Sequence, residues 1–166
     1  MKNVSQLLPF NNPVKAQLFD KDGNLKWEDE CFNGIVTEGL ALLYDVLFEG
    51  GTAPTALYIA LMTDPVTESD ADTYASHGYT ENTDYSSPAN RPEWVASTTA
   101  RAHSNSITAD FTMSGPNDIA GIAIVTNVAT KGDTAGSADL WATAKFSTVA
   151  SVVLSDVLKI TYTVQG

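Results

Sequence analysis

The feature that most constrains the fold is the alternation of apolar and polar residues in two segments of the second half of the chain. Apolar side chains recur there at every second position, which is the period of a β-strand with one face in a core and the other in solvent. Such a strand is stable only when other strands pair with it and its apolar face is covered. The two segments are 104–114, with Ile107, Ala109, Phe111 and Met113 as the apolar positions, and 158–164, with Leu158, Ile160, Tyr162 and Val164.

Three further segments are predicted strands, and the first of them, 56–62, is continuously apolar, as expected of a strand that is covered on both faces. Turn residues separate the strand-like segments, at Gly115-Pro116-Asn117-Asp118 and at Lys131-Gly132-Asp133. Short strands separated by such turns are typical of β-sandwiches and barrels. The second segment, 119–126, is another apolar run, and 140–146 completes the set.

The stretch FDKDGNLKWEDE predicts a β-hairpin. Strand-like flanks, Val14 to Phe19 and Leu25 to Phe32, lie on either side of Asp22-Gly23, and this pair provides the positive φ of a tight turn. The alternative is a calcium-binding loop, because the pattern Asp-x-Asp-x-Asn also begins such a loop.

The calcium-binding loop requires glycine at its sixth position and a bidentate glutamate at its twelfth. Counted from Asp20, those positions hold Leu25 and Cys31, and Gly23 comes two residues early. We therefore expect a hairpin without a metal ion.

One segment, GIVTEGLALLYDVLFEGG, has the period of a helix. Its apolar residues follow the i, i+4, i+7 spacing of one helical face, and Gly50-Gly51 provides the expected stop. Gly39 indicates close packing on another backbone, because a glycine otherwise weakens a helix by about 1 kcal/mol. The sequence predicts one long helix over residues 35–48. Its apolar face comprises Ile35, Val36, Leu40, Leu43 and Leu47, with Val46 beside them.

Together these patterns predict one mainly β domain over residues 14–166. The expected architecture is an antiparallel β-sandwich or barrel-like sandwich with one amphipathic α-helix packed on it. Residues 63–93 are too long for an ordinary connection, so we expect an ordered surface excursion that packs onto the sheet. One short strand is expected near 79–85. The aromatic residues available for packing are Tyr74, Tyr79, Tyr85 and, just beyond the excursion, Trp94.

Residues 1–13 are expected to form an extended N-terminal arm, because its two prolines block a helix and restrict the backbone. The candidate interface residues of the sequence are three large apolar side chains of this arm, Leu7, Leu8 and Phe10. They would be unfavourable if exposed alone, so we expect them to be buried on a neighbouring molecule or on the arm's own domain. Both destinations remain open, and attachment to a neighbour is the working hypothesis.

The charge of the chain disfavours some partners. With 20 acidic and 9 basic residues it carries a net charge of −11 and has a pI near 4.3, which opposes binding to nucleic acid or to an anionic membrane. The longest apolar runs, near 40–43 and 57–62, are too short to span a bilayer, and we expect no classical secretory signal. Cys31 is the only cysteine, so no internal disulfide can form.

The sequence contains no recognisable catalytic motif. His77, His103 and Cys31 lack the spacing of a zinc site, and neither a Gly-x-Ser-x-Gly elbow nor a phosphate-binding glycine loop occurs. Four acidic residues of the excursion could gather around a cation, but a polar loop is the simpler interpretation. We therefore expect no enzyme, no catalytic residues, no cofactor and no metal ion. The acidic residues are Asp64, Glu68, Asp70 and Asp72, and the tryptophans expected as core anchors or interface residues are Trp27, Trp94 and Trp141.

Five stretches, from about Val14 to near the end of the chain, carry a resemblance to a known family. They are FDKDGNLKWEDE, NGIVTEGLALLYDVLFEGGTAPTALYIALMTD, ASHGYTENTDYSSPANRPEWV, NSITADFTMSGPNDIAGIAIV and LWATAKFSTVASVVLSDVLKITYTV. Their order resembles that in small virion structural proteins of tailed bacteriophages. The resemblance implies an all-β module of the virion, assembled in the cytoplasm of the host bacterium, and no catalytic residues.

Two roles follow from this resemblance. The first is a capsid decoration (cement) protein that stabilises the head shell. Its partners would be the major capsid protein or other virion subunits, and it would form a homo-oligomer, with a trimer favoured. The alternative is a tail- or fibre-associated attachment module, in which tryptophan and tyrosine residues on loops bind host-surface glycans. An enzyme is the third class, and the missing motif disfavours it.

Overall fold

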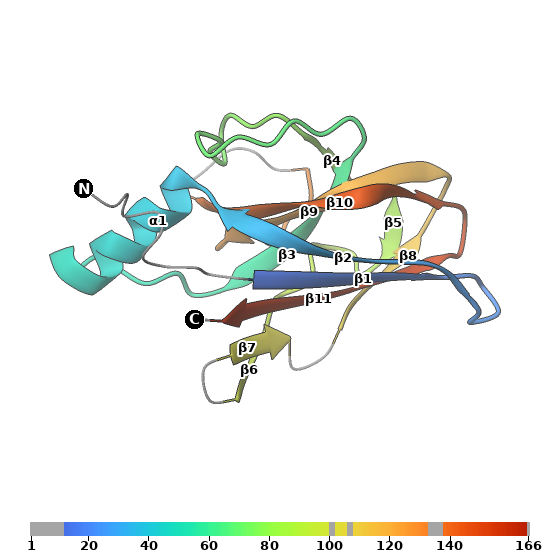
Figure 1. Ribbon diagram of the computed structural model, residues 1–166, viewed down its shortest axis with the longest axis horizontal. Helices are drawn as coiled ribbons and strands as arrows, with labels where there is room; N and C mark the ends of the chain where they lie inside the picture. The colour runs from blue at the N-terminus through green and yellow to red at the C-terminus, as the bar shows by residue number, and fades with distance from the viewer. Residues whose placement is uncertain (1–11, 100–101, 106–107, 133–137, 166) are drawn as a thin grey trace.

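The fold is mainly β. The computed structural model describes residues 12–99, 102–105, 108–132 and 138–165, and 53% of these described residues are in strands. The strands form a nearly closed antiparallel barrel with a single short helical segment at one end (Figure 1). The expected mainly β, barrel-like fold is therefore confirmed. In chain order the elements are β1 (Asn12–Phe19), β2 (Leu25–Ile35), α1 (Thr37–Tyr44), the π-helix η2 (Asp45–Glu49), β3 (Leu57–Thr63), β4 (Thr80–Asn82), β5 (Tyr85–Ser87), β6 (Ala96–Thr99), β7 (Ala102–Asn105), β8 (Ala109–Met113), β9 (Asn117–Thr126), β10 (Leu140–Val152) and β11 (Val157–Gln165).

The strands are hydrogen-bonded in the order β4-β3-β9-β10-β2-β1-β11-β7-β6, and β8 pairs with both β11 and β5. Trp94 connects β3 to β11, which are far apart in this order. Its backbone N–H donates to the Leu57 carbonyl at 2.8 Å, and its indole N–H donates to the Tyr162 carbonyl at 2.9 Å. One residue thus helps to close the barrel between these two strands.

The main core lies inside the barrel, at the inward-facing positions of the strands. β1 and β11 both show the alternation of strands with one buried face. The three tryptophans pack against this core, which confirms their expected role as core anchors. The buried positions of the two strands are Val14, Ala16 and Leu18 in β1, and Leu158, Ile160 and Tyr162 in β11.

A second, smaller core lies where the excursion and the residues just before α1 pack on β3, β9 and β10. Both neighbouring positions Leu61 and Met62 of β3 are fully buried, one in each core. This explains why ALYIALM is continuously apolar, as predicted. Tyr74 is buried in the second core and Tyr79 packs against it, so the excursion packs onto the sheet as expected. It contains two short strands, β4 and β5, where one was predicted.

β1 and β2 form the hairpin predicted from FDKDGNLKWEDE. Gly23 has a φ of +84°, as the turn requires, and the Asp20 N–H donates to the Asn24 carbonyl at 2.9 Å. The Asp20 carboxylate accepts hydrogen bonds from the side-chain amide and backbone N–H of Asn24, and from the backbone N–H of Asp22. These bonds, the Asn24 side chain first, hold the pKa of Asp20 below its ordinary value. The carboxylate is thus a structural part of the turn.

Several strand boundaries differ from the predictions. Segment 104–114 contains two strands, β7 and β8, which pair with successive parts of β11, while Ile107 lies outside the described residues. β10 continues past its predicted end at residue 146, because it bulges between Lys145 and Ala150 and then pairs with β9 again. β9 begins at Asn117, so the turn predicted at 115–118 is shorter. β6 was not predicted, since Ala-Ser-Thr-Thr has no large apolar residue.

The helical segment also differs from the helix predicted over 35–48. α1 begins at Thr37, because Ile35 is still part of β2 and pairs with Ala142 of β10. At its other end the segment widens into η2 and stops at Gly50, which has a φ of +78°, as the Gly50-Gly51 signal predicted. Gly39 is the one fully buried residue of α1, so the helix stands at the end of the barrel with much of its surface exposed.

Candidate interaction surface

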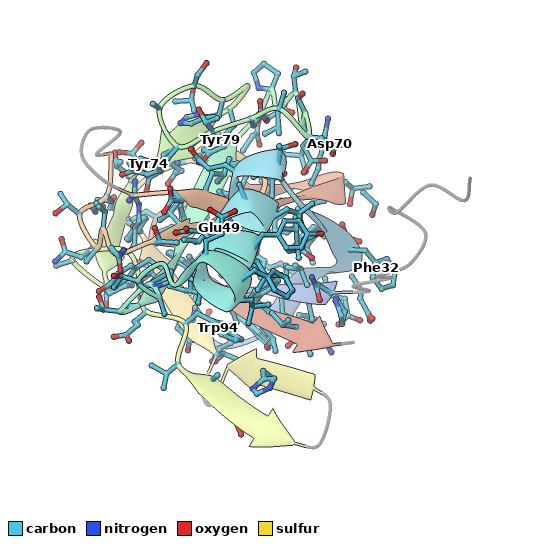
Figure 2. The ribbon with its side chains drawn as sticks, turned by 90° about the vertical axis from the view of Figure 1, so that its left-hand side faces the viewer. Phe32, Glu49, Asp70, Tyr74, Tyr79 and Trp94 are labelled. Atoms are coloured by element: carbon cyan, nitrogen blue, oxygen red, sulfur yellow. The ribbon has the colours of Figure 1, made fainter. Side chains whose placement is uncertain are left out.

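The helical segment presents an apolar face to solvent. Tyr44, Leu47 and Phe48 are 41%, 62% and 77% exposed, and the rings of Tyr44 and Phe48 lie with their centroids 6.1 Å apart. We call these three residues the outer helix face. Figure 2 looks onto this end of the molecule, with Glu49 on the helical segment and the exposed Phe32 of β2 off to one side.

The outer helix face depends on the π-helical last turn. In a regular α-helix Leu47 would lie on the same side as Leu40 and Leu43, which are partly buried. A π-turn contains more residues per turn and therefore rotates the residues that follow it. Leu47 leaves the covered side in this way, so the prediction of Leu47 as part of the packed face is wrong.

Two contacts hold the first turn of α1 on the barrel. Gly39 lies directly against β10, where an added Cβ atom would be 2.3 Å from the Trp141 carbonyl oxygen. The Glu38 carboxylate accepts the backbone N–H of Tyr74 at 2.8 Å and that of Leu140 at 2.6 Å. The predicted close packing at Gly39 is confirmed, and Glu38 joins the helix to both the excursion and β10.

An apolar groove lies on the inner side of the helical segment, between it, the residues that lead into β3, and β10. We call it the inner groove. Its volume is about 190 Å³. Pockets for drug-sized ligands measure roughly 300–1,000 Å³, so the inner groove has room for one or two side chains rather than for a cofactor. It is lined by Leu42, Leu43, Val46, Pro54, Leu57 and Trp141.

A buried polar cluster lies next to the Trp141 wall of the inner groove. The Tyr162 hydroxyl accepts hydrogen bonds from the Asn33 side-chain amide at 3.0 Å and from the Trp141 indole N–H at 3.2 Å. Burial raises the pKa of Tyr162 to about 12, against the lowering effect of these two hydrogen bonds. Asn33 is the register partner of Asn12, where the described chain begins.

The predicted interface residues Leu7, Leu8 and Phe10 lie outside the described residues. The described chain begins at Asn12, at the same end of the barrel as α1 (Figure 1). Asn12 and Pro13 belong to β1, so the strand begins inside the range that the sequence assigned to the arm.

Exposed apolar side chains also lie at the opposite end of the barrel. Leu25 and Leu154 are 49% and 65% exposed. The start of β2 lies close to the turn between β10 and β11, because Lys26 forms an ion pair of 2.5 Å with the buried Asp156. We call Leu25, Val153 and Leu154 the far-end group.

The excursion surrounds a second cavity of about 260 Å³, lined in part by Tyr74, Glu81 and Arg91. The Arg91 guanidinium forms two hydrogen bonds with the Glu81 carboxylate, at 2.8 and 2.6 Å, and these side chains are only 2% and 6% exposed. Arg91 also donates to the Tyr74 hydroxyl at 3.2 Å and to the Val128 carbonyl at 3.0 Å, while Glu81 accepts the Gly132 N–H at 2.7 Å. These groups hold the excursion on the barrel.

His77 lies beside this cavity and contacts Tyr79. The two rings stack with centroids 3.8 Å apart, and the His77 Nδ1 atom lies 2.9 Å from the Tyr79 carbonyl oxygen. Burial raises the pKa of Tyr79 above its ordinary value, and the Glu81 charge adds to this effect. The two rings form an aromatic surface next to the buried ion pair.

Among the described residues, no group of three or more histidine, cysteine, aspartate or glutamate side chains could hold a metal ion. Asp72 of the acidic loop is buried, and its carboxylate accepts the Ser69 N–H at 3.1 Å. Burial raises the pKa of the Cys31 thiol to about 12, which makes it a poor nucleophile. Within the described ranges, no helix is long and apolar enough to cross a membrane.

Comparisons of the chain with protein families, with curated proteins and with solved structures find no match. The surfaces described above and the segment pattern of the sequence are therefore the basis for a functional proposal.

Proposed function

We propose that this chain is a structural protein of a bacteriophage virion, and specifically a capsid decoration (cement) protein that stabilises the head shell. The outer helix face carries this proposal, because Tyr44, Leu47 and Phe48 are exposed together on one element. Large apolar side chains that are exposed next to one another mark protein–protein contact sites. The chain as a whole is strongly acidic, with a net charge of −11, which opposes contact with nucleic acid and non-specific association.

The architecture suits such a role. A decoration protein has to keep its shape on the outside of a particle. This chain has a single cysteine, so an internal disulfide cannot provide that stability and other contacts have to do so. Trp94 links two distant strands, and the Arg91–Glu81 pair fixes the long excursion. The partners we propose are the major capsid protein or other virion subunits, and the location is the virion.

The test uses phage particles assembled without this chain. Purified wild-type protein should sediment with such particles and reduce their release of DNA on heating. The variant Leu47→Ser/Phe48→Ser should bind at least about tenfold more weakly, because loss of central apolar anchors typically costs more than 1 kcal/mol each. Its melting temperature should stay close to that of the wild type, since both side chains are exposed.

The matched control is Leu25→Ser/Leu154→Ser in the far-end group, which should bind like the wild type. If the helix variant binds as well as the wild type, the outer helix face is not the attachment surface. If the wild type does not bind the particles at all, the proposal of a decoration protein fails.

We also propose that the chain forms a homo-oligomer, with a trimer favoured, as the family resemblance implies. Light scattering at micromolar concentration measures this directly. A monomer at all accessible concentrations would contradict it.

The alternative function is a tail- or fibre-associated module that binds host-surface glycans. The aromatic surface of His77 and Tyr79, beside a cavity of about 260 Å³, favours it, because aromatic rings stack on sugar faces and polar groups nearby can orient hydroxyls. Glycan-array binding that is lost in Tyr79→Ala would support this function. An array without any bound glycan would count against it.

A further inference from the structure

We infer that the outer helix face binds a basic partner, namely a surface of a different protein with an apolar centre and lysine or arginine side chains around it. The inference rests on the part of the proposed function that makes the outer helix face an attachment surface, and it names the chemistry of the surface that is contacted. Its basis is the acidic side chains beside the exposed apolar ones and the distribution of charge along the chain.

Two acidic side chains lie beside the apolar ones on the helical segment. Asp45 directly follows Tyr44, and both are exposed. Glu49 follows Phe48 in the same way. The rings of Tyr44 and Phe48 lie with their centroids 6.1 Å apart, so the two acids form a second row, about a quarter turn around the helix from the aromatic row. Within the described residues neither carboxylate takes part in an ion pair, and the helical segment contains no lysine or arginine.

The chain concentrates its negative charge in the part that contains the helical segment. Residues 27–90 include twelve acidic residues and no lysine or arginine, whereas the rest of the chain has eight acidic and nine basic residues. The net charge of −11 therefore comes from this stretch, and the rest is close to neutral. Such a field attracts a positively charged surface and increases the rate of its association.

The acidic loop of the excursion extends the negative surface to the start of the helix. The N–H of Thr37, the first residue of α1, donates to the Asp70 carbonyl at 2.8 Å, and Figure 2 shows Asp70 at the same end of the molecule as the helical segment. Glu68 and Asp70 are exposed and line a hollow of about 290 Å³ between this loop, β2 and β10. Lys145 reaches the same loop, but it donates to the Val66 carbonyl, at 3.0 Å. A lysine or arginine of the partner therefore has acidic side chains to meet at both ends of the helical segment.

The same charges disfavour other occupants of the outer helix face. A second copy that docked there through its own outer helix face would bring two acidic helical segments together, and like charges that face each other weaken an interface. Nucleic acid and anionic membranes are negatively charged as well. The proposed homo-oligomer should therefore form through another surface. The outer helix face is left for a different protein, which in the proposed function is a subunit of the head shell.

The test uses two synthetic peptides in place of the partner surface. Each is a short amphipathic helix with leucines on one face. Lysines occupy the other face of the first peptide, and glutamates replace them in the second. Binding of the dye-labelled peptides to the full-length protein is measured by fluorescence anisotropy, and NMR spectra identify the backbone amides that respond. We expect the lysine peptide to bind at least about tenfold more tightly than the glutamate peptide, with the shift changes centred on residues 44–49.

The decisive variant is Asp45→Asn/Glu49→Gln, which removes two charges and keeps the shapes of the side chains. At low salt it should bind the lysine peptide about two- to tenfold more weakly than the wild type, because an exposed charge pair contributes little. In about 1 M salt, where charge effects reach only about 3 Å, the two proteins should bind it equally. The matched control is Asp22→Asn/Glu28→Gln in the β1–β2 hairpin. It changes the net charge by the same amount and should bind like the wild type. All four side chains are exposed, so both variants should keep the melting temperature of the wild type.

The apolar centre is tested with Leu47→Ser/Phe48→Ser, which should also weaken binding of the lysine peptide, since the leucines then lose their contacts. Unchanged binding of this variant would overturn the inference, and so would equal binding of the two peptides or no binding of the lysine peptide at low salt. Equal weakening in the helix and hairpin charge variants would overturn it as well, because only the net charge would then attract the peptide.

The peptide test is separate from the test with particles, so the two proposals can fail independently. If the protein binds particles but does not select the lysine peptide, the basic partner is wrong and the decoration role stands. If the lysine peptide binds at residues 44–49 but the protein does not bind particles, the decoration role fails and the basic partner stands.

Discussion

Replacing Arg91 by methionine tests how the long excursion is held on the barrel. Methionine keeps much of the side-chain length but has no charge and no N–H donors. The Glu81 carboxylate would then stay buried, with 6% of the side chain exposed, and would keep only the Gly132 N–H among the partners described above. Arg91 is charged in the native protein: burial lowers its pKa, but the hydrogen bonds with Glu81 and Tyr74 outweigh that effect and raise it.

The expected cost is about 3–5 kcal/mol, the usual range when one partner of a buried ion pair is removed. This is a large part of the stability of a typical domain, which is about 5–15 kcal/mol. For a chain of this length each kcal/mol lowers the melting temperature by about 2–4 °C, so the variant should melt about 6–20 °C below the wild type. The double variant Arg91→Met/Glu81→Gln should be less destabilised than the sum of the single variants by about 1–3 kcal/mol, because the buried charge is then absent.

The assay is urea and thermal unfolding, followed by far-UV circular dichroism. Lys21→Met is the matched control, because Lys21 forms an ion pair with Asp22 in which the side chains are 70% and 64% exposed. Exposed pairs contribute about 0–1 kcal/mol. If Arg91→Met and Lys21→Met cost the same, the buried pair does not anchor the excursion and the reasoning is refuted.

Three other substitutions test the packing around the helix and the groove. Gly39→Ala would stabilise an isolated helix by about 1 kcal/mol, but should lower the melting temperature here, since its Cβ atom would lie 2.3 Å from the Trp141 carbonyl oxygen; an unchanged or higher melting temperature would contradict this packing. Tyr162→Phe removes the acceptor of two hydrogen bonds and should cost about 2–4 kcal/mol in urea unfolding, whereas a cost below about 1 kcal/mol would show that both donors find other partners. Burial and, after it, the charge of Glu38 raise the pKa of Asp139, although the Thr126 hydroxyl lowers it. The folded protein therefore holds this proton more tightly than the unfolded chain, so the contribution of Asp139 to stability falls as pH rises from acidic to neutral. Asp139→Asn should therefore gain stability relative to the wild type over the same change, and a difference that does not vary with pH would contradict this.

Much of the barrel could be predicted from the sequence, because the strand period is a local signal. The hairpin followed from Asp22-Gly23 between two strand-like flanks, and β11 followed from the alternation of Leu158, Ile160 and Tyr162. The close approach at Gly39 could also be predicted, since a glycine inside a helix needs a reason to be there.

The candidate surface could not be predicted, because it depends on long-range and irregular features. The helical period alone places Leu47 on the covered side, and no signal in DVLFE marks the π-turn that exposes it. The Arg91–Glu81 pair was also missed, since the two positions are ten residues apart in sequence, with the short strand β5 between them, and only the folded excursion brings them together. The inner groove joins residues from three separate segments and has no sequence pattern of its own.

The measurement that tests the central proposal most directly is the location of the chain in purified phage particles. Gold-labelled antibodies against the protein, viewed by electron microscopy, separate the two roles that the sequence implies. We predict label distributed over the icosahedral head, as expected of a decoration protein. Label confined to the tail would contradict the decoration role, and particles without the protein would contradict its assignment to the virion.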